Sequence, residues 1–140
     1  MMALPRLYAI LDVAAFPDSD GLMAAAEGLA AGGVRLLQYR NKSGNSRQML
    51  EQARELKRRL GDSVLLIMND RADLCLAAGF GGVHLGQDDL SPEGARRVIG
   101  PNLRLGVSTS DAEFSDRRRD ETNRTTSFYA KERELRNFYI

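Results

Sequence analysis

The feature that most constrains the fold is an alternation of two kinds of segment over the first 112 residues. Short apolar runs rich in β-forming residues are separated by stretches with helical spacing of apolar residues. Five runs are expected to be strands: 6–11, 34–39, 64–68, 82–85 and 103–107. Strands that are apolar through their middles and alternate with helices indicate an α/β fold, with a parallel sheet covered by helices. The sheet is either an open doubly wound sheet or a (β/α) barrel.

Four helices are expected between these strands, and the sequence predicts where each begins. Asp20 is the predicted cap of the first helix and Ser46 that of the second, which ends near Gly61. The third helix covers 71–80, and the fourth begins at Ser91, which is followed by a proline. The charged outer face of the second helix is expected to be a solvated surface.

Polar residues gather where the second to fifth strands end. Both candidate architectures place their sites at the carboxyl ends of parallel strands. The segment after the first strand is not a GxGxxG phosphate loop. Polar residues spread over four consecutive strand ends suit the mouth of a barrel better than a single crevice, although periodicity alone leaves both architectures open.

Bulk composition indicates one soluble domain. The chain has 140 residues, a net charge of +1 and a single cysteine, Cys75. Its charge gives no reason to expect a nucleic-acid partner, and no apolar run is long enough to cross a membrane. One cysteine excludes an intramolecular disulfide and favours a reducing compartment. We therefore expect a cytoplasmic protein.

Residues 113–140 differ in composition from the rest. This tail has no glycine, and 13 of its 28 residues are charged. We expect no sixth buried strand here, but disorder or a marginal helix over 128–139. Arg117, Arg118 and Arg119 could suggest nucleic-acid contact, but six acidic residues accompany the seven basic ones of the tail, which argues against it.

Gln38, Arg40 and Lys42 alternate with other residues at the end of the second strand. If the extended conformation persists, all three project from one face of the sheet. Two cations with no carboxylate between them suit an external phosphate or diphosphate. The alternative is an exposed strand end that makes only surface salt bridges.

Asn69 and Asp70 end the third strand, and Asp88 and Asp89 follow the fourth. Asp70 and Asp89 form an oxygen-only set that suits Mg²⁺, which takes one or two carboxylates plus phosphate oxygens and water. The alternatives are a helix cap at Asn69–Asp70 and a plain loop at Asp88–Asp89.

Two further residues are candidates on the fourth and fifth strands. His84 is more typical of a core histidine with satisfied hydrogen bonds than of a general base. Ser108 could donate a hydrogen bond to phosphate or cap a following helix.

Four segments, QYRNK, IMNDRADL, GVHLGQDDL and GVSTS, together resemble the thiamine phosphate synthase family over about residues 6–112. The resemblance implies a (β/α)8 TIM barrel, of which residues 1–112 would hold about five βα units, followed by the atypical tail 113–140. It also implies a transferase of thiamine biosynthesis. That enzyme joins an aminopyrimidine methyl diphosphate to a thiazole phosphate, releases pyrophosphate and uses Mg²⁺.

The resemblance also implies a role for each matching position. Gln38 would orient the aminopyrimidine ring, while Arg40, Lys42 and Asn69 would hold the diphosphate. Ser108 would donate a further hydrogen bond, which makes it a catalytic candidate together with Arg40 and Lys42. Asp70 and Asp89 would ligate Mg²⁺.

The sequence departs from the family pattern in two places. Asn41 stands where the family usually has glutamate, so a local ion pair is expected to be missing. The family pattern also stops near residue 112, before the later strands and the turns that would hold the thiazole phosphate. Two alternatives follow: a thiazole tautomerase of the same family, or an inactive fragment that acts only through association.

We predict little or no turnover by the 140-residue chain alone, together with self-association through an unpaired parallel strand edge. A pyrophosphate-release assay on the purified chain tests the first expectation and sedimentation velocity tests the second. Turnover at a rate typical of enzymes would contradict the first.

Overall fold

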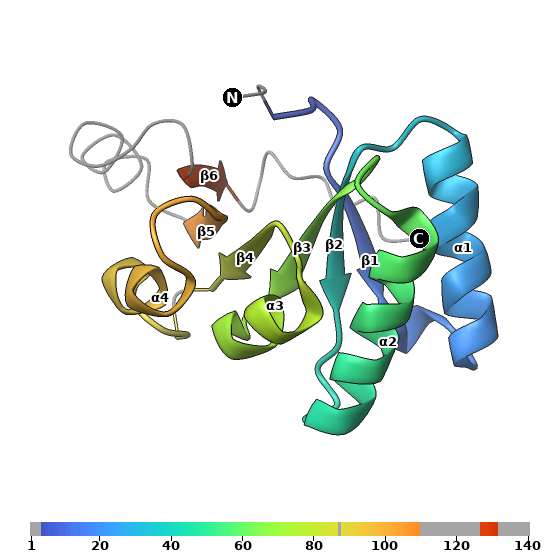
Figure 1. Cartoon of the computed structure of the whole chain (residues 1–140), viewed down its shortest axis with the longest axis horizontal. Coiled ribbons are helices and arrows are strands. Elements are labelled where there is room, and N and C mark those ends of the chain that lie inside the picture. The colour runs from blue at the N-terminus through green and yellow to red at the C-terminus, as the bar shows by residue number, and fades with distance from the viewer. Residues whose placement is uncertain (1–3, 87, 110–126, 132–140) are drawn as a thin grey trace.

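The structure, a computed structural model, describes residues 4–86, 88–109 and 127–131. Strands and helices alternate along the chain, with one short 3-10 helix after the first strand (Figure 1). The strands are β1 (Ala9–Asp12), β2 (Leu36–Arg40), β3 (Leu65–Asn69), β4 (Gly82–Leu85), β5 (Arg104–Thr109) and β6 (Ser127–Lys131). The helices are η1 (Val13–Ala15), α1 (Ser19–Ala31), α2 (Ser46–Leu60), α3 (Ala72–Ala78) and α4 (Pro92–Ile99). The five strands and four helices predicted for residues 1–112 are confirmed.

The six strands form one parallel sheet whose order follows the chain, from β1 to β6. A doubly wound sheet changes direction within its strand order, whereas a (β/α) barrel adds each strand next to the preceding one. The helices follow the same progression, because α1 contacts α2, α2 contacts α3 and α3 contacts α4 (Figure 1). The strand order therefore identifies the barrel-type arrangement that the sequence left open.

One face of the sheet packs against the helices and forms the main core. Side chains alternate along a strand, so every second residue of each strand points to this face. The strand residues in this core are Ala9, Leu11, Leu37, Tyr39, Leu66, Met68, Val83, Leu85, Leu105 and Val107. The intervening residues, including Gln38, Asn69 and His84, lie on the opposite face, which we call the inner face.

Two predicted helix caps are wrong by one or two residues. The Asp18 side chain accepts a hydrogen bond from the Gly21 N–H at 2.8 Å and caps α1, so Asp20 lies inside the first turn. The Asn45 side chain accepts from the Gln48 N–H at 3.1 Å and caps α2. Asp and Asn cap helices as well as Ser does, so a run of such residues does not by itself fix the first turn. The cap at Ser91 is confirmed, with its Oγ accepting from the Gly94 N–H at 3.0 Å.

The tail contains a strand that was not predicted, and the marginal helix predicted over 128–139 is wrong for residues 128–131. Residues 127–131 form β6, which pairs in parallel with β5 from Leu105–Ser127 to Thr109–Lys131. Phenylalanine and tyrosine favour strands, and the backbone of β5 offers hydrogen-bonding groups along its edge. The remaining tail, including Arg117, Arg118 and Arg119, lies outside the described residues.

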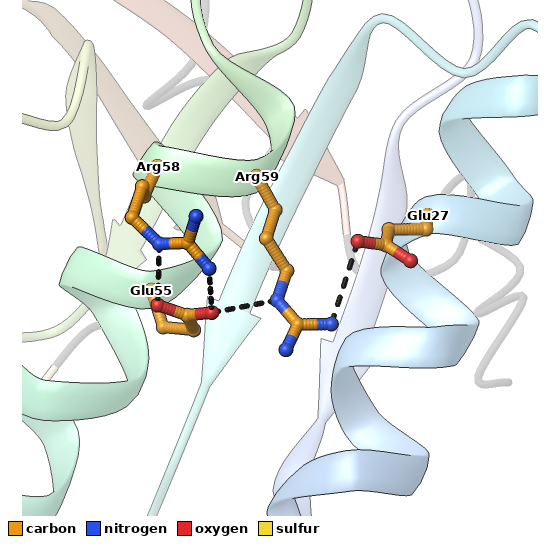
Figure 2. A network of polar contacts seen from close by, with 4 residues as sticks. All are labelled: Glu27, Glu55, Arg58 and Arg59. Carbon is orange, nitrogen blue, oxygen red and sulfur yellow. Dashed lines mark hydrogen bonds and ion pairs between the residues drawn. The ribbon is translucent and has the colours of Figure 1, made fainter.

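The charged outer face of α2 pairs largely with itself (Figure 2). Glu55 accepts hydrogen bonds from Arg58 at 2.5 and 2.9 Å and from Arg59 at 2.7 Å. Arg59 also reaches Glu27 on α1 at 3.4 Å, which links the two helices at the surface. Hydrogen bonds from the two guanidinium groups lower the pKa of Glu55 to about 2. The prediction of a solvated face is confirmed.

In the ranges that the structure describes, none of the helices has the length and apolar character that a membrane span requires.

We predict that Leu56→Ala destabilises the chain by about 2–5 kcal/mol, because Leu56 is fully buried in α2 and its removal leaves a cavity. The exposed neighbour Arg54 provides the control, and Arg54→Ala is expected to change stability by no more than about 0.5 kcal/mol. Urea unfolding followed by circular dichroism measures both. Equal losses in the two variants would contradict the packing of α2 described here.

Candidate functional site

The candidate site lies on the inner face at the carboxyl ends of the strands. The register places Asp12 opposite Arg40 and Asn69 opposite His84. His84 is in turn opposite Gly106, two residues before Ser108. Five consecutive strands thus contribute polar side chains to one face of the sheet, as the sequence predicted for β2 to β5.

The two cations predicted to bind an anion form ion pairs within the protein. Arg40 pairs with Asp12 on β1, and Lys42 pairs with Asp70 after β3. Neighbouring strands thus supply the carboxylates that the β2 segment lacks, and the ion pairs named in the alternative prediction are present. The side chains of Arg40 and Lys42 nevertheless keep 32% and 54% of their surface exposed, so an incoming anion can reach both.

The carboxyl groups of Asp70 and Asp89 lie close enough for each to shift the pKa of the other. Burial acts to raise the pKa of Asp70, but the hydrogen bonds from Asp89 and Lys42 and the nearby charges outweigh it, so its pKa is lowered. Burial and the hydrogen bond with Asp70 raise the pKa of Asp89, which also accepts from the Gly86 N–H at 2.7 Å. Asp88 is exposed. The structure thus brings together the two residues predicted to bind a metal.

The backbone of Asp70 is in the left-handed region, with φ at 64°. Aspartate tolerates this conformation better than most residues, but it still costs on the order of 1 kcal/mol. The Asp70 N–H donates to the carbonyl of His84 at 2.8 Å, which holds the turn against β4. The turn places the Asp70 carboxylate beside Lys42 and Asp89.

Asn69 is buried, with 7% of its surface exposed, and its Nδ2 has no hydrogen-bond partner within the part of the chain that the structure describes. The alternative prediction, a helix cap at Asn69–Asp70, is wrong because Arg71 occupies the cap position of α3 and no side chain there makes a capping bond. A buried amide donor that lacks an acceptor costs about 1–3 kcal/mol. A ligand that brings an acceptor oxygen to this donor would remove that cost.

His84 and Tyr8 link Gln38 to Ser108 across the inner face. The Nδ1 of His84 is 3.1 Å from the Tyr8 hydroxyl, and its Nε2 is 2.7 Å from Ser108 Oγ. The amide nitrogen of Gln38 donates to the same Tyr8 hydroxyl at 2.7 Å. Burial lowers the pKa of His84 to about 4, against an opposing effect of Asp70, so the imidazole is neutral near pH 7. The prediction of a core histidine with satisfied hydrogen bonds is confirmed.

Tyr8 was not among the predicted site residues, because its hydroxyl makes hydrogen bonds with residues 30 and 76 positions away in the sequence. Tyr8 stands two residues before Ile10. If the extended conformation of β1 continues toward the N-terminus, this spacing places Tyr8 on the inner face, and the sequence could have indicated it in this way.

Asn41 belongs to a buried hydrogen-bond network instead of marking a missing ion pair. Its Nδ2 donates to the Tyr39 hydroxyl at 3.0 Å, and its Oδ1 accepts from the Ser43 N–H at 2.9 Å. Tyr39 donates to Gln52, whose amide donates to Ser19 at 2.8 Å. The network anchors the loop that carries Lys42 to α1 and α2.

The donor set fits a hard divalent cation that binds together with phosphate. In the described ranges no group of three or more His, Cys, Asp or Glu side chains could hold a metal by itself. Asp70 and Asp89 are neighbouring carboxyls, and burial and Asp70 raise the pKa of Asp89. Mg²⁺ typically takes one or two carboxylates and completes its coordination with phosphate oxygens and water.

We predict that Asp89→Asn stabilises the free protein near pH 7 by roughly 0.5–1 kcal/mol. The substitution removes a like charge and keeps an oxygen that can accept from the Gly86 N–H. A carboxyl with a raised pKa binds more protons in the folded than in the unfolded state, so its contribution to stability falls as the pH rises. The gain should shrink as the pH is lowered and the native carboxyl becomes protonated.

Urea unfolding at several pH values from neutral to mildly acidic measures this gain. Asp88→Asn is the matched control, since it removes the same charge from the exposed neighbour. A gain of the same size in both variants would attribute the effect to net charge and contradict the pairing of Asp70 with Asp89.

Comparisons with known proteins agree with this architecture. The sequence model of a family described as "Thiamine monophosphate synthase" matches residues 7–124. A thiamine-phosphate synthase of Koribacter versatilis (strain Ellin345) is 58% identical over 115 residues, which are 80% of this chain and 54% of that protein. One from Chloroflexus aurantiacus (strain ATCC 29366 / DSM 635 / J-10-fl) is 46% identical over 106 residues, covering 74% and 47% of the two chains.

The solved structure of a thiamine phosphate pyrophosphorylase from Pyrococcus furiosus superposes with a TM-score of 0.69 at 29% identity. The match covers 89% of this chain and 58% of that one. The chain thus spans about half the length of the curated relatives it matches. Its fold is part of a TIM-barrel-like α/β fold, and the chain belongs to the thiamine monophosphate synthase family.

Proposed function

We propose that this chain carries the diphosphate-binding part of a thiamine phosphate synthase site. That transferase joins an aminopyrimidine methyl diphosphate to a thiazole phosphate and releases pyrophosphate. The observation that carries the proposal is the buried Nδ2 of Asn69, which has no hydrogen-bond partner among the described residues and directly precedes Asp70, the ion-pair partner of Lys42. A diphosphate has acceptor oxygens for this donor and negative charge for the cations.

The protein groups would act mainly on the leaving group. In the reaction, the bond between the pyrimidine methylene carbon and the diphosphate oxygen breaks, and a bond from the thiazole nitrogen to that carbon forms. Arg40, Lys42 and Asn69 would bind the diphosphate and stabilise the negative charge that grows on it. Ser108 would donate one more hydrogen bond, and Gln38 would orient the pyrimidine ring. No protein nucleophile is required.

Asp70 and Asp89 would hold Mg²⁺ beside the diphosphate. When bound, the ion would neutralise part of the charge on the departing pyrophosphate. Lys42 pairs with Asp70 in the free protein, so binding would redistribute this ion pair between the diphosphate and the metal. The tautomerase alternative involves no diphosphate and leaves the buried donor of Asn69 unexplained.

Cytoplasmic location is part of the same proposal, supported by the single buried, free cysteine.

The proposal is tested by thermal melting of the chain with Mg²⁺, with inorganic pyrophosphate and with both. We expect Tm to rise only when both are present, because the two carboxylates bind pyrophosphate only through the metal. At a free ligand concentration about 100 times the Kd, the stabilisation is about 2.7 kcal/mol. Absence of any rise with both ligands would contradict the proposal.

The variant Asn69→Leu shows whether the Asn69 amide contributes to ligand binding or to the stability of the fold. Because Nδ2 has no partner to lose among the residues that the structure describes, the free variant should melt at the same temperature as the native chain or higher. The ligand-dependent rise should be largely lost. Asn102→Leu, the same change at an exposed position before β5, should keep the full rise. A variant of Asn69 that is destabilised but binds normally would show that the amide has a structural role.

A further inference from the structure

Four side chains, from β2, β4, β5 and the residue before β1, form a continuous hydrogen-bonded relay on the inner face: Gln38, His84, Ser108 and Tyr8. In the proposed function the two outer members, Gln38 and Ser108, contact the substrate. The two inner members, Tyr8 and His84, have no role there. The direction in which hydrogens point along this relay decides what Gln38 and Ser108 can offer to a ligand.

The hydrogen bond from Gln38 favours one direction for the hydrogens along the relay. An amide nitrogen can only donate, so the Tyr8 oxygen accepts from Gln38. The hydrogen of Tyr8 can then point to Nδ1 of His84, which accepts it. A neutral imidazole has one N–H, which in this case lies on Nε2 and donates to Ser108 Oγ. Each contact in the relay then has one donor and one acceptor.

The opposite direction conflicts with an anionic ligand. If His84 carried its hydrogen on Nδ1, the Tyr8 oxygen would accept hydrogen bonds from both Gln38 and His84. The Ser108 hydroxyl would then have to donate its hydrogen bond to Nε2. Ser108 could then turn only lone pairs toward a diphosphate, which also has only lone pairs to offer. In the first direction the Ser108 hydrogen is available to an acceptor oxygen.

We propose that Tyr8 and His84 are positioning residues whose relay sets the site to present the amide oxygen of Gln38 and the hydroxyl hydrogen of Ser108 to the substrate. The inference rests on the proposed function for the nature of the ligand. It gives the site an acceptor at one end and a donor at the other. This polarity matches a molecule with an amino group on its ring and a diphosphate on its side chain, as an aminopyrimidine methyl diphosphate has.

The direction of the relay can be measured without any ligand. His84 is the single histidine of the chain, so a long-range proton–nitrogen NMR spectrum of the imidazole contains one set of signals. We expect a neutral ring with its hydrogen on Nε2 near pH 7. A ring with its hydrogen on Nδ1, or a protonated ring, would overturn the proposal. Tyr8→Phe should shift the Nδ1 signal, since it removes the hydroxyl that donates to that nitrogen.

The effect on ligand binding is measured by titrating Mg²⁺-pyrophosphate into four variants. Ser108→Ala and His84→Asn should each weaken binding about 10-fold to 100-fold, the range for one hydrogen bond to a charged group. The double variant should bind no more weakly than Ser108→Ala, because His84 acts through Ser108. Independent, multiplying losses would overturn the relay. His84→Gln, whose amide nitrogen can reach the position of Nε2, should bind more tightly than His84→Asn.

The two proposals fail in different ways. If the native chain does not bind Mg²⁺-pyrophosphate, the diphosphate site is wrong, and the role of the relay in presenting Ser108 falls with it even when the tautomer is as expected. If the native chain binds and the His84 variants bind equally well, only the relay is wrong. Circular dichroism melts of each variant separate loss of binding from loss of folding.

Discussion

The two-residue alternation of side chains along parallel, in-register strands is the constraint on which both the core and the site depend. On β2, Leu37 and Tyr39 fill the core under α1 and α2, while Gln38 and Arg40 between them reach the inner face. The same alternation on β3 and β4 places Asn69 and His84 opposite each other. A shift of one residue in the register of any strand would exchange apolar for polar residues on both faces, so packing of the helices also aligns the site.

Charge in the free site is balanced by the protein's own groups. Arg40 forms an ion pair with Asp12 and Lys42 with Asp70, and Asp70 lies close enough to Asp89 to raise its pKa. Within the described part of the chain, one carboxyl thus has a raised pKa and one buried amide donor lacks an acceptor. Both are unfavourable in the free protein and would be relieved by a cation bound with an anionic oxygen ligand. The site is therefore less stable than its surroundings in the way that functional sites commonly are.

Local patterns predicted most of the fold because the strands are short, apolar and separated by helices of clear spacing. Their failures have physical reasons. Asp18 and Asn45 cap their helices because several residues in each segment can do so equally well, and the choice depends on where the chain leaves the preceding turn. β6 forms in a segment with few aliphatic residues because the edge of β5 supplies backbone partners, which composition does not reveal. The carboxylate partners of Arg40 and Lys42 were not predicted because they lie outside the β2 segment and come close only after the strands align.

The site motifs lie in β2 to β5, yet the relay that joins Gln38 to Ser108 passes through Tyr8, which precedes β1. Tyr8 is 76 residues from His84 in sequence, and no local spacing relates the two. A strand that supplies few ligand-binding residues can therefore still determine how the ligand is bound, through the orientation of groups on its neighbours. In a sheet built in chain order, β1 reaches β4 only across the inner face, because β2 and β3 lie between them in the ladder. Curvature of the sheet toward that face is what brings Tyr8 within hydrogen-bonding distance of His84, so the barrel-type curvature is itself a requirement of the relay.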